Sequence, residues 1–148
     1  MKLSTRATYG LRALLVLACK YGQGPVLLRD IAEMQDLPTT YLEQLMVLMR
    51  KSGLVSATRG INGGYRLMRD PSQITLAEII LVLEGPLDLV ECAAIASCHR
   101  SPTTCALKAT LDEASQLLLD HLKSVTLQQL CERQHVMDGI MGPSSCLT

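Results

Sequence analysis

Apolar residues recur at every third or fourth position along most of this chain, a spacing that predicts helices. The first such segment predicts a helix over about residues 5–21, and Gly22 stands where a glycine could end it in the left-handed conformation. Its apolar face would be made by Leu11, Leu14, Leu15 and Ala18. A shorter helix is expected over residues 28–35.

The stretch TTYLEQLMVLMRKSG, which begins at Thr39, has the same helical spacing. Thr40 and Glu43 are spaced as in a capping box, and Gly53 is placed to end the helix. The positions that would face the core are Leu42, Leu45, Met46 and Met49. Two short helices joined by a tight turn predict a helix-turn-helix.

The helical spacing of apolar residues then stops. Residues 54–58 and 65–68 are typical of strands, with a glycine-rich turn between them. A hairpin directly after a helix-turn-helix predicts a winged helix, in which the hairpin is the wing. Arg59 would lie at the tip of this wing, and Arg66 and Arg69 on its returning strand.

The second half of the chain is helical again. Thr75 and Glu78 have capping-box spacing at the start of a helix that Gly85 would end, and a long amphipathic helix is expected from about Thr104. Its apolar stripe exceeds what a small winged helix can cover, so we expect a homodimer seam; packing onto its own domain is the alternative. The stripe consists of Leu107, Leu111, Ala114, Leu117, Leu118, His121, Leu122 and Val125.

A last short helix is expected from Thr126, where Gln129 completes a third capping box, and the tail from Gly139 is expected to be disordered. The predicted fold class is mainly α, a winged helix-turn-helix domain with a small β-hairpin wing and a long C-terminal dimerisation helix. We divide the chain into a winged-helix domain, a cysteine-containing loop, a dimerisation helix with a short terminal helix, and a flexible tail: residues 1–85, 86–105, 106–135 and 136–148.

Basic side chains are concentrated in the first half. Residues 1–69 hold 10 Lys and Arg against 4 Asp and Glu, a net charge of +6, whereas residues 70–148 hold 4 against 10, a net charge of −6. Together with the winged helix, this asymmetry favours double-stranded DNA as a partner.

No apolar run reaches the ~18 residues that span a bilayer, so we expect a cytoplasmic protein with no membrane contact. No nucleophile–base pair or phosphate-binding glycine loop is present, so we do not expect an enzyme.

Side chains on the second short helix and on the wing are candidates for DNA contact. Gln44 can pair with adenine, and Arg59 beside a glycine suits a narrow A·T minor groove. The candidate set is Thr39, Thr40, Tyr41, Glu43, Gln44, Lys51, Arg59, Gly60 and Asn62. For each single residue, helix capping, packing or turn formation is an equally weighted alternative.

Three of the six cysteines lie in the stretch ECAAIASCHRSPTTC. In a reducing cytoplasm they are expected as thiols or metal ligands rather than as disulfides. Cys92, Cys98 and Cys105 are separated by five and six residues, wider than the pairs of a zinc knuckle, which favours an iron–sulfur cluster over small apolar filling. The other three are expected to be one core residue and two incidental ones: Cys19, and Cys131 with Cys146.

The segments MKLSTRATYGLRAL, YLEQL, RGINGGY and ITLAEIILVLEGP occur in this order before the three-cysteine loop. Over residues 1–135 the chain resembles the IscR-type winged-helix regulators, a family that also includes NsrR, RirA and CymR. The resemblance implies a dimeric bacterial transcription factor with crossing C-terminal helices. It also implies cluster ligation by Cys92, Cys98 and Cys105, ligands that the CymR type lacks.

The resemblance leaves the fourth cluster ligand open. IscR has a histidine where this chain has Lys108, and NsrR-like members have an aspartate where it has Thr8. His99, a side chain of the partner subunit or a small exogenous ligand could complete the set, and we favour [2Fe-2S] over [4Fe-4S]. The resemblance also implies that Glu43 disfavours one class of DNA site, since a carboxylate near phosphates is repelled.

The sequence therefore predicts a homodimeric regulator, such as a repressor, that binds a palindromic operator and senses iron–sulfur status, an oxidant or nitric oxide. Cluster occupancy is expected to order the loop and shift the adjoining dimer helix. A cluster-free thiol- or zinc-responsive regulator is the alternative. An adaptor whose winged helix binds a protein is a third interpretation, and salt-insensitive binding would indicate it.

Overall fold

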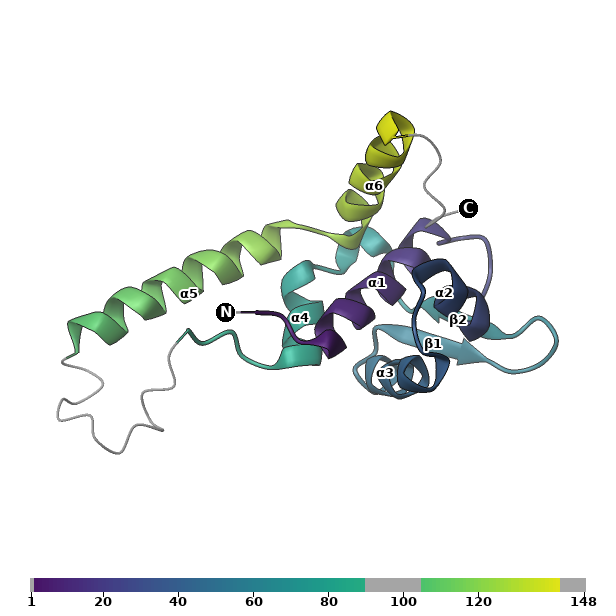
Figure 1. Cartoon of the computed structure of the whole chain (residues 1–148), viewed down its shortest axis with the longest axis horizontal. Helices are drawn as coiled ribbons and strands as arrows, with labels where there is room; N and C mark the ends of the chain where they lie inside the picture. The colour runs from purple at the N-terminus through teal and green to yellow at the C-terminus, as the bar shows by residue number, and fades with distance from the viewer. Residues whose placement is uncertain (1, 90–104, 142–148) are drawn as a thin grey trace.

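The computed structural model describes residues 2–89 and 105–141, which form a mainly helical fold with one two-stranded antiparallel sheet (Figure 1). The elements in chain order are α1 (Thr5–Cys19), α2 (Leu28–Gln35), α3 (Thr39–Lys51), β1 (Val55–Thr58), β2 (Gly64–Leu67), a 3-10 turn (Pro71–Gln73), α4 (Leu76–Glu84), α5 (Ala106–Ser124) and α6 (Leu127–Met141). The predicted fold class is confirmed.

The helix-turn-helix consists of α2 and α3, and local backbone geometry ends both helices. Asp36 ends α2 in the left-handed conformation with φ 50°. Gly53, with φ 78°, follows α3, and the N–H of Leu54 donates to the carbonyl of Met49 at 3.0 Å. This pattern is a Schellman motif, so the predicted role of Gly53 is confirmed.

A backbone bridge ties the wing to the residue that precedes α2 by two positions, in addition to the packing of Val55 and Leu67 in the core. β1 and β2 pair with Val55 opposite Leu67, and Val26 exchanges two hydrogen bonds of 2.8 Å with Tyr65 on β2. Gly64 has φ 141°, and a Cβ there would lie 2.5 Å from the Val26 carbonyl oxygen. Only glycine fits this close backbone approach.

Helix α1 runs through the centre of the core and contacts α2, α3, α4 and α6. It approaches α4 closely at Gly10, where a Cβ would lie 2.5 Å from Cδ1 of Leu83. The largest fully buried side chains are Leu14, Ile31, Leu42, Met46, Met49, Leu54, Ile74, Ile79, Leu83, Leu127, Val16 and Val55. Helix α3 is therefore supported from behind by α1 and α4.

The start of α4 is fastened to the junction between α5 and α6. Thr75 accepts a hydrogen bond from the Glu78 N–H at 3.2 Å and forms a β-bridge with Thr126. The N–H of Leu76 donates to the Val125 carbonyl at 2.8 Å. Beyond this bridge α5 runs away from the body, and none of its described residues is buried, whereas α6 packs against α1 (Figure 1).

Two predictions about helix ends in the first half are wrong. Helix α1 ends at Cys19, so Gly22, with φ 81°, lies in the turn beyond the helix rather than directly after it. Thr40 does not cap α3, because Pro38 has φ −62° and ψ 119° and occupies the N-cap position itself. Helix α3 therefore begins at Thr39 without a side-chain cap from any described residue.

The second half also differs from expectation at particular residues. Val125 is buried and lies after the end of α5, so it does not widen the apolar stripe. Thr126 and Gln129 form the predicted reciprocal capping box, with hydrogen bonds of 3.0 and 3.3 Å. Helix α6 nevertheless continues through Gly139, because polar pairs one turn apart stabilise it along its length. The expected short helix and early tail are wrong.

The side chain of Glu78 completes no capping box. It pairs instead with Arg69, which follows the wing. The Thr75 half of the predicted box is confirmed and the Glu78 half is wrong, because a nearby guanidinium competes for the carboxylate. This pair connects the base of the wing to α4.

Candidate functional site

Helix α3 has one buried apolar face and one exposed polar face. The buried residues are Leu42, Leu45, Met46 and Met49, as expected from the sequence. The exposed ones are Thr39, Thr40, Glu43, Gln44, Val47, Arg50 and Lys51. The first two turns therefore present hydroxyl, carboxylate and amide groups to solvent. In a recognition helix, these N-terminal turns are the part that reaches base edges.

Among the candidate DNA-contact residues of α3, Tyr41 is half-buried. Its half-buried ring stands edge-on to the ring of Tyr9 on α1, with centroids 5.8 Å apart. Arg12 lies next to this pair, with its guanidinium carbon 5.9 Å from the Tyr9 centroid, and its Nε donates to Oε1 of Gln35 at 2.9 Å. These four residues join α1, α2 and α3 behind the exposed face.

Sequence reasoning missed Tyr9, Arg12 and Gln35. Gln35 is 7% exposed and is the buried polar residue of the described core, so its side chain needs a partner there. Arg12 supplies that partner through Nε and also donates to the Gln35 backbone carbonyl. The sequence did show an arginine next to the apolar face of the first helix, which could have indicated a buried polar contact. It does not say which residue Arg12 would contact.

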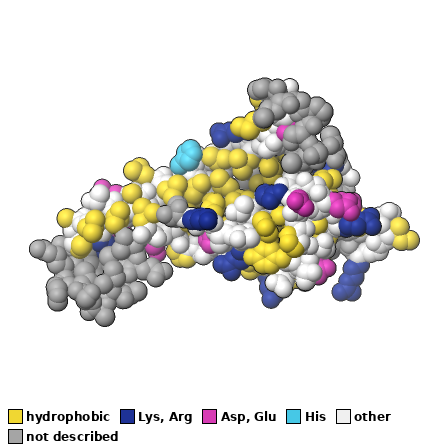
Figure 2. Space-filling model, viewed as in Figure 1, with side chains coloured by type: hydrophobic (Ala, Val, Ile, Leu, Met, Phe, Trp, Pro, Cys, Tyr) yellow, Lys and Arg dark blue, Asp and Glu magenta, His cyan; other side chains and the backbone are white. Residues whose placement is uncertain are grey.

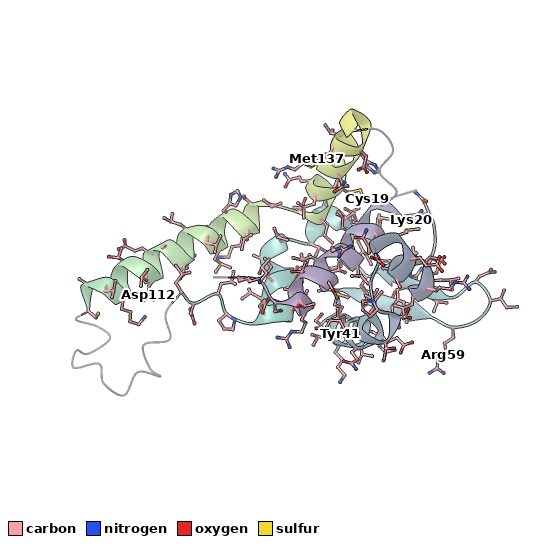
Figure 3. The ribbon with its side chains drawn as sticks, viewed as in Figure 1. Cys19, Lys20, Tyr41, Arg59, Asp112 and Met137 are labelled. Carbon is pink, nitrogen blue, oxygen red and sulfur yellow. A yellow bond between two sulfur atoms is a disulfide. The ribbon has the colours of Figure 1, made fainter. Side chains whose placement is uncertain are left out.

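The wing tip is fully open to solvent around Arg59. Gly60 has φ 107° and accepts a hydrogen bond from the Gly63 N–H at 2.9 Å, which closes a tight turn. Arg59, Gly60 and Asn62 are exposed, and the side chain of Ile61 is 100% exposed. Figure 3 shows Arg59 projecting away from the body at this end of the molecule.

The other two arginines predicted on the returning strand are engaged within the chain, and Arg69 lies beyond the end of β2 rather than on it, so that part of the prediction is wrong. Arg66 donates from Nε to the Ser56 hydroxyl at 3.3 Å, and Arg69 pairs with Glu78. Figure 2 shows that Lys and Arg side chains gather on the half of the molecule formed by the helix-turn-helix and wing, with fewer on α5. The basic first half of the sequence therefore also forms a more basic half of the folded protein.

Cys105 is the single member of the predicted cluster ligands that lies in the described part of the chain. It is a free, half-buried thiol at the N-cap position of α5. Cys92 and Cys98, together with His99, lie outside the described residues. The donor set itself, three thiols in one short stretch, suits an iron–sulfur cluster, which takes thiolate ligands.

The two family positions for a fourth ligand are engaged in other contacts. Lys108 pairs with Asp112 one turn along α5, and the Thr8 hydroxyl donates to the Ser4 carbonyl at 3.0 Å. A protonated lysine that pairs with a carboxylate is a poor metal ligand, because it must first lose a proton.

The expectations for Cys19 and Cys131 are wrong, because the two form a disulfide that joins α1 to α6. Their Cα atoms are 5.6 Å apart although they are 112 positions apart in the sequence. Nε2 of His135 lies 3.4 Å from Sγ of Cys131. No local spacing could have paired cysteines so far apart in the chain.

The Rrf2 family model, whose description reads iron-dependent transcriptional regulator, matches residues 3–133. The chain belongs to the Rrf2 family. It is 36% identical over 138 residues to the HTH-type transcriptional regulator IscR of Photorhabdus laumondii, which covers 93% of this chain and 84% of that protein. IscR of Escherichia coli matches at the same identity, with 85% of that protein covered.

Solved structures of Rrf2 proteins share the fold. The global cysteine regulator CymR of B. subtilis gives a TM-score of 0.73 at 38% identity, covering 90% of this chain and 98% of that one. IscR of T. potens gives 0.73 at 38% identity, covering 90% and 88%. An oxidised form of CymR from Staphylococcus aureus gives 0.71 at 34% identity, covering 89% and 97%.

These relatives confirm the resemblance to IscR-type regulators. This chain is an Rrf2-family transcriptional regulator and, as its relatives' names indicate, not an enzyme. Within residues 2–89 and 105–141, no helix is long and apolar enough to cross a membrane.

Proposed function

We propose that this protein binds a palindromic DNA operator as a homodimer in the cytoplasm and regulates transcription in response to iron–sulfur status, an oxidant or nitric oxide. The observation that carries the proposal is the exposed polar face of α3 next to a wing that ends in exposed Arg59. A single α-helix fits the major groove, and a guanidinium suits the narrow minor groove beside it.

The DNA contacts are divided between the two elements. Thr39, Thr40 and Gln44 at the start of α3 face base edges, and Lys51 at its end faces phosphate. On the wing, Arg59 enters the minor groove, while Gly60 and Asn62 form the turn that presents it. Tyr41 holds α3 in place through its ring and contributes at most its hydroxyl group to DNA.

Glu43 acts against binding at some sites. It is exposed on α3 and makes no capping box with Thr40, so its carboxylate faces the DNA side of the helix. A carboxylate near phosphates lowers affinity unless it accepts from a cytosine amino group. Glu43 therefore selects between operator classes.

Helix α5 forms the dimer interface. Leu107 and Leu117 on this helix are 70% and 73% exposed, and α5 has no buried residue in its described length. An amphipathic helix that long with its apolar side chains in water is stabilised by a second copy lying along it. Two wings and two α3 helices then face one palindromic operator.

Cys92, Cys98 and Cys105 hold the iron–sulfur cluster, which we take as [2Fe-2S]. When bound, the cluster supplies a redox- and nitric-oxide-reactive centre. Cys105 begins α5, so any ligand on its thiolate is joined directly to the helix that we assign to the dimer interface. The fourth ligand comes from His99, from the partner subunit or from a small exogenous molecule.

A cluster-free, thiol-responsive regulator is the second candidate. It is favoured by the Cys19–Cys131 disulfide and by the likeness to CymR, a cysteine regulator in B. subtilis. Iron and sulfide analysis separates the two candidates.

The test begins with protein purified without oxygen, in which iron, sulfide and visible absorption are measured. DNA sites are then selected from a random duplex pool, and affinity is measured for the wild type and for a Cys92→Ala, Cys98→Ala, Cys105→Ala triple variant. Cys146→Ala serves as the matched control. Iron-free wild type after reconstitution, or unchanged affinity in an iron-free triple variant, would contradict cluster sensing and leave DNA binding to be judged by the selected sites.

A further inference from the structure

A second cysteine site lies at the contact between α1 and α6, separate from the loop of the proposed cluster. Cys19 is the last residue of α1 and is half-buried, and Cys131 on α6 is 8% exposed. Figure 3 shows Cys19 at the end of α1 where α6 begins. A Cα separation of 5.6 Å lets the pair form and break a disulfide without backbone movement.

His135 distinguishes this pair from a merely structural crosslink. It follows Cys131 by one helical turn, its Nε2 is 3.4 Å from Sγ of Cys131, and it is exposed to solvent. An imidazole N–H that donates to sulfur favours the thiolate, which is the reactive form of cysteine. The site therefore places an imidazole beside the sulfur of Cys131 and a second cysteine within bonding distance of it.

We propose that Cys19 and Cys131 are a reversible modification site for hydroperoxides, with Cys131 as the reacting thiol and His135 as the group that activates it. The Cys131 thiol gives its proton to His135, and the thiolate attacks the peroxide oxygen. The O–O bond breaks, Cys131 sulfenic acid forms, and the leaving hydroxide or alkoxide takes the proton back from His135 and departs as water or an alcohol. The Cys19 thiol then attacks the sulfenic sulfur, the S–S bond forms and water leaves. A dithiol reductant returns both thiols by exchange and becomes a disulfide itself.

Oxidation fixes the outer part of α6 to the DNA-binding half of the chain. The start of α6 is already held where the N–H of Leu127 donates to the Ile74 carbonyl at 3.0 Å. Cys131 is the last buried residue of α6 in the described range, and residues 132–139 are exposed or half-buried. The disulfide thus joins α6 to α1 at the last buried residue of α6 in the described range, and its reduction should loosen the turns that follow.

The experiment uses the full wild-type chain, reduced and then exposed to hydrogen peroxide, with differential alkylation and peptide mass mapping at successive times. We expect a Cys19–Cys131 linkage that a dithiol reverses in the folded protein. His135→Gln should slow its formation about tenfold, since less thiolate is present. The matched control is His121→Gln, because His121 is an exposed histidine on α5.

A second variant keeps the test decisive if His135→Gln does not fold. In Cys19→Ser, oxidation should stop at a Cys131 sulfenic acid that dimedone labels. The proposal is overturned if the linkage does not form while other cysteines oxidise, if a dithiol cannot reduce it in the folded state, or if His121→Gln slows it as much as His135→Gln. It is also overturned if the reduced protein retains one zinc ion per chain through Cys19, Cys131 and His135 that prevents the disulfide. None of these readouts depends on iron or on DNA.

Discussion

The ring of Tyr41 stands edge-on to the ring of Tyr9, with centroids 5.8 Å apart and ring planes at 76°. This contact joins the first turn of α3 to α1 and supports the part of α3 that carries exposed polar residues. A residue that the sequence suggests as a DNA contact is thereby also a structural support of the helix that we propose reads DNA.

Replacing Tyr41 tests whether its ring supports α3. Tyr41→Ala should lower the free energy of unfolding by about 2 kcal/mol, because it removes a half-buried ring and an aromatic pair. Tyr41→Phe keeps the ring and should stay within about 0.5 kcal/mol of the wild type. Urea unfolding measures both values, with Val47→Ala on the exposed face as the control. Equal losses for Phe and Ala would mean that the hydroxyl, not the ring, supports α3.

Arg59→Ala should weaken operator binding by ~1–3 kcal/mol, with the largest loss at sites whose flanks are rich in A·T. The physical reason is that a narrow minor groove attracts a guanidinium. The measurement is affinity by fluorescence anisotropy on selected operators with A·T or G·C flanks. Lys123→Ala, on exposed α5, is the control. An equal loss on both operator types would mean that Arg59 contacts only a phosphate. In that case the salt dependence of the binding constant should correspond to one released counterion fewer.

Charged substitutions on the apolar stripe of α5 should dissociate the dimer. In a Leu107→Asp, Leu117→Asp double variant, two carboxylates would be forced into the interface, and sedimentation velocity should show a monomer. Ala109→Asp is the matched control, because Ala109 is exposed on the same helix but is not part of the apolar stripe. A double variant that sediments like the wild type would place the dimer interface elsewhere or show that the chain is monomeric.

Acid should weaken the attachment of the N-terminus to α4. The Ser4 hydroxyl and backbone N–H, which donate to Glu84, lower the pKa of its carboxyl group. A carboxyl with a lowered pKa contributes stability that is present at neutral pH and is lost as the pH falls through that folded-state pKa. Glu84→Gln should therefore reduce Tm at neutral pH and flatten its decline in acid. Asp88→Asn, which changes an exposed carboxyl, is the control, and the same flattening there would contradict the assignment.

Much of the fold follows from local patterns in the sequence. Gly53 ends α3 because the left-handed conformation favours glycine, and the glycine-rich turn makes a hairpin whether or not the rest of the chain is known. Thr40 shows the limit of this reasoning, since Pro38 had already fixed an extended backbone one position before the helix. Capping spacing alone does not say which residue occupies the N-cap position.

The candidate site was predictable only where it is made by one segment. The exposed face of α3 follows from helical periodicity, and the open wing tip follows from its glycines. The support behind that face does not, because Arg12 and Gln35 meet only once α1 and α2 have packed. The Cys19–Cys131 pair is the extreme case, since its partners lie near opposite ends of the chain and share no local pattern.

The bridge between Thr75 and Thr126 bears on how this chain tolerates insertions and deletions. Because α4 starts and α5 finishes at one fixed point, the segment that joins the two helices can change in length without moving α3 or the wing. The entropy of closing a loop grows only with the logarithm of its length, so doubling it costs about 0.6 kcal/mol. The linking segment can therefore vary in length between relatives while the proposed DNA-binding surface stays the same.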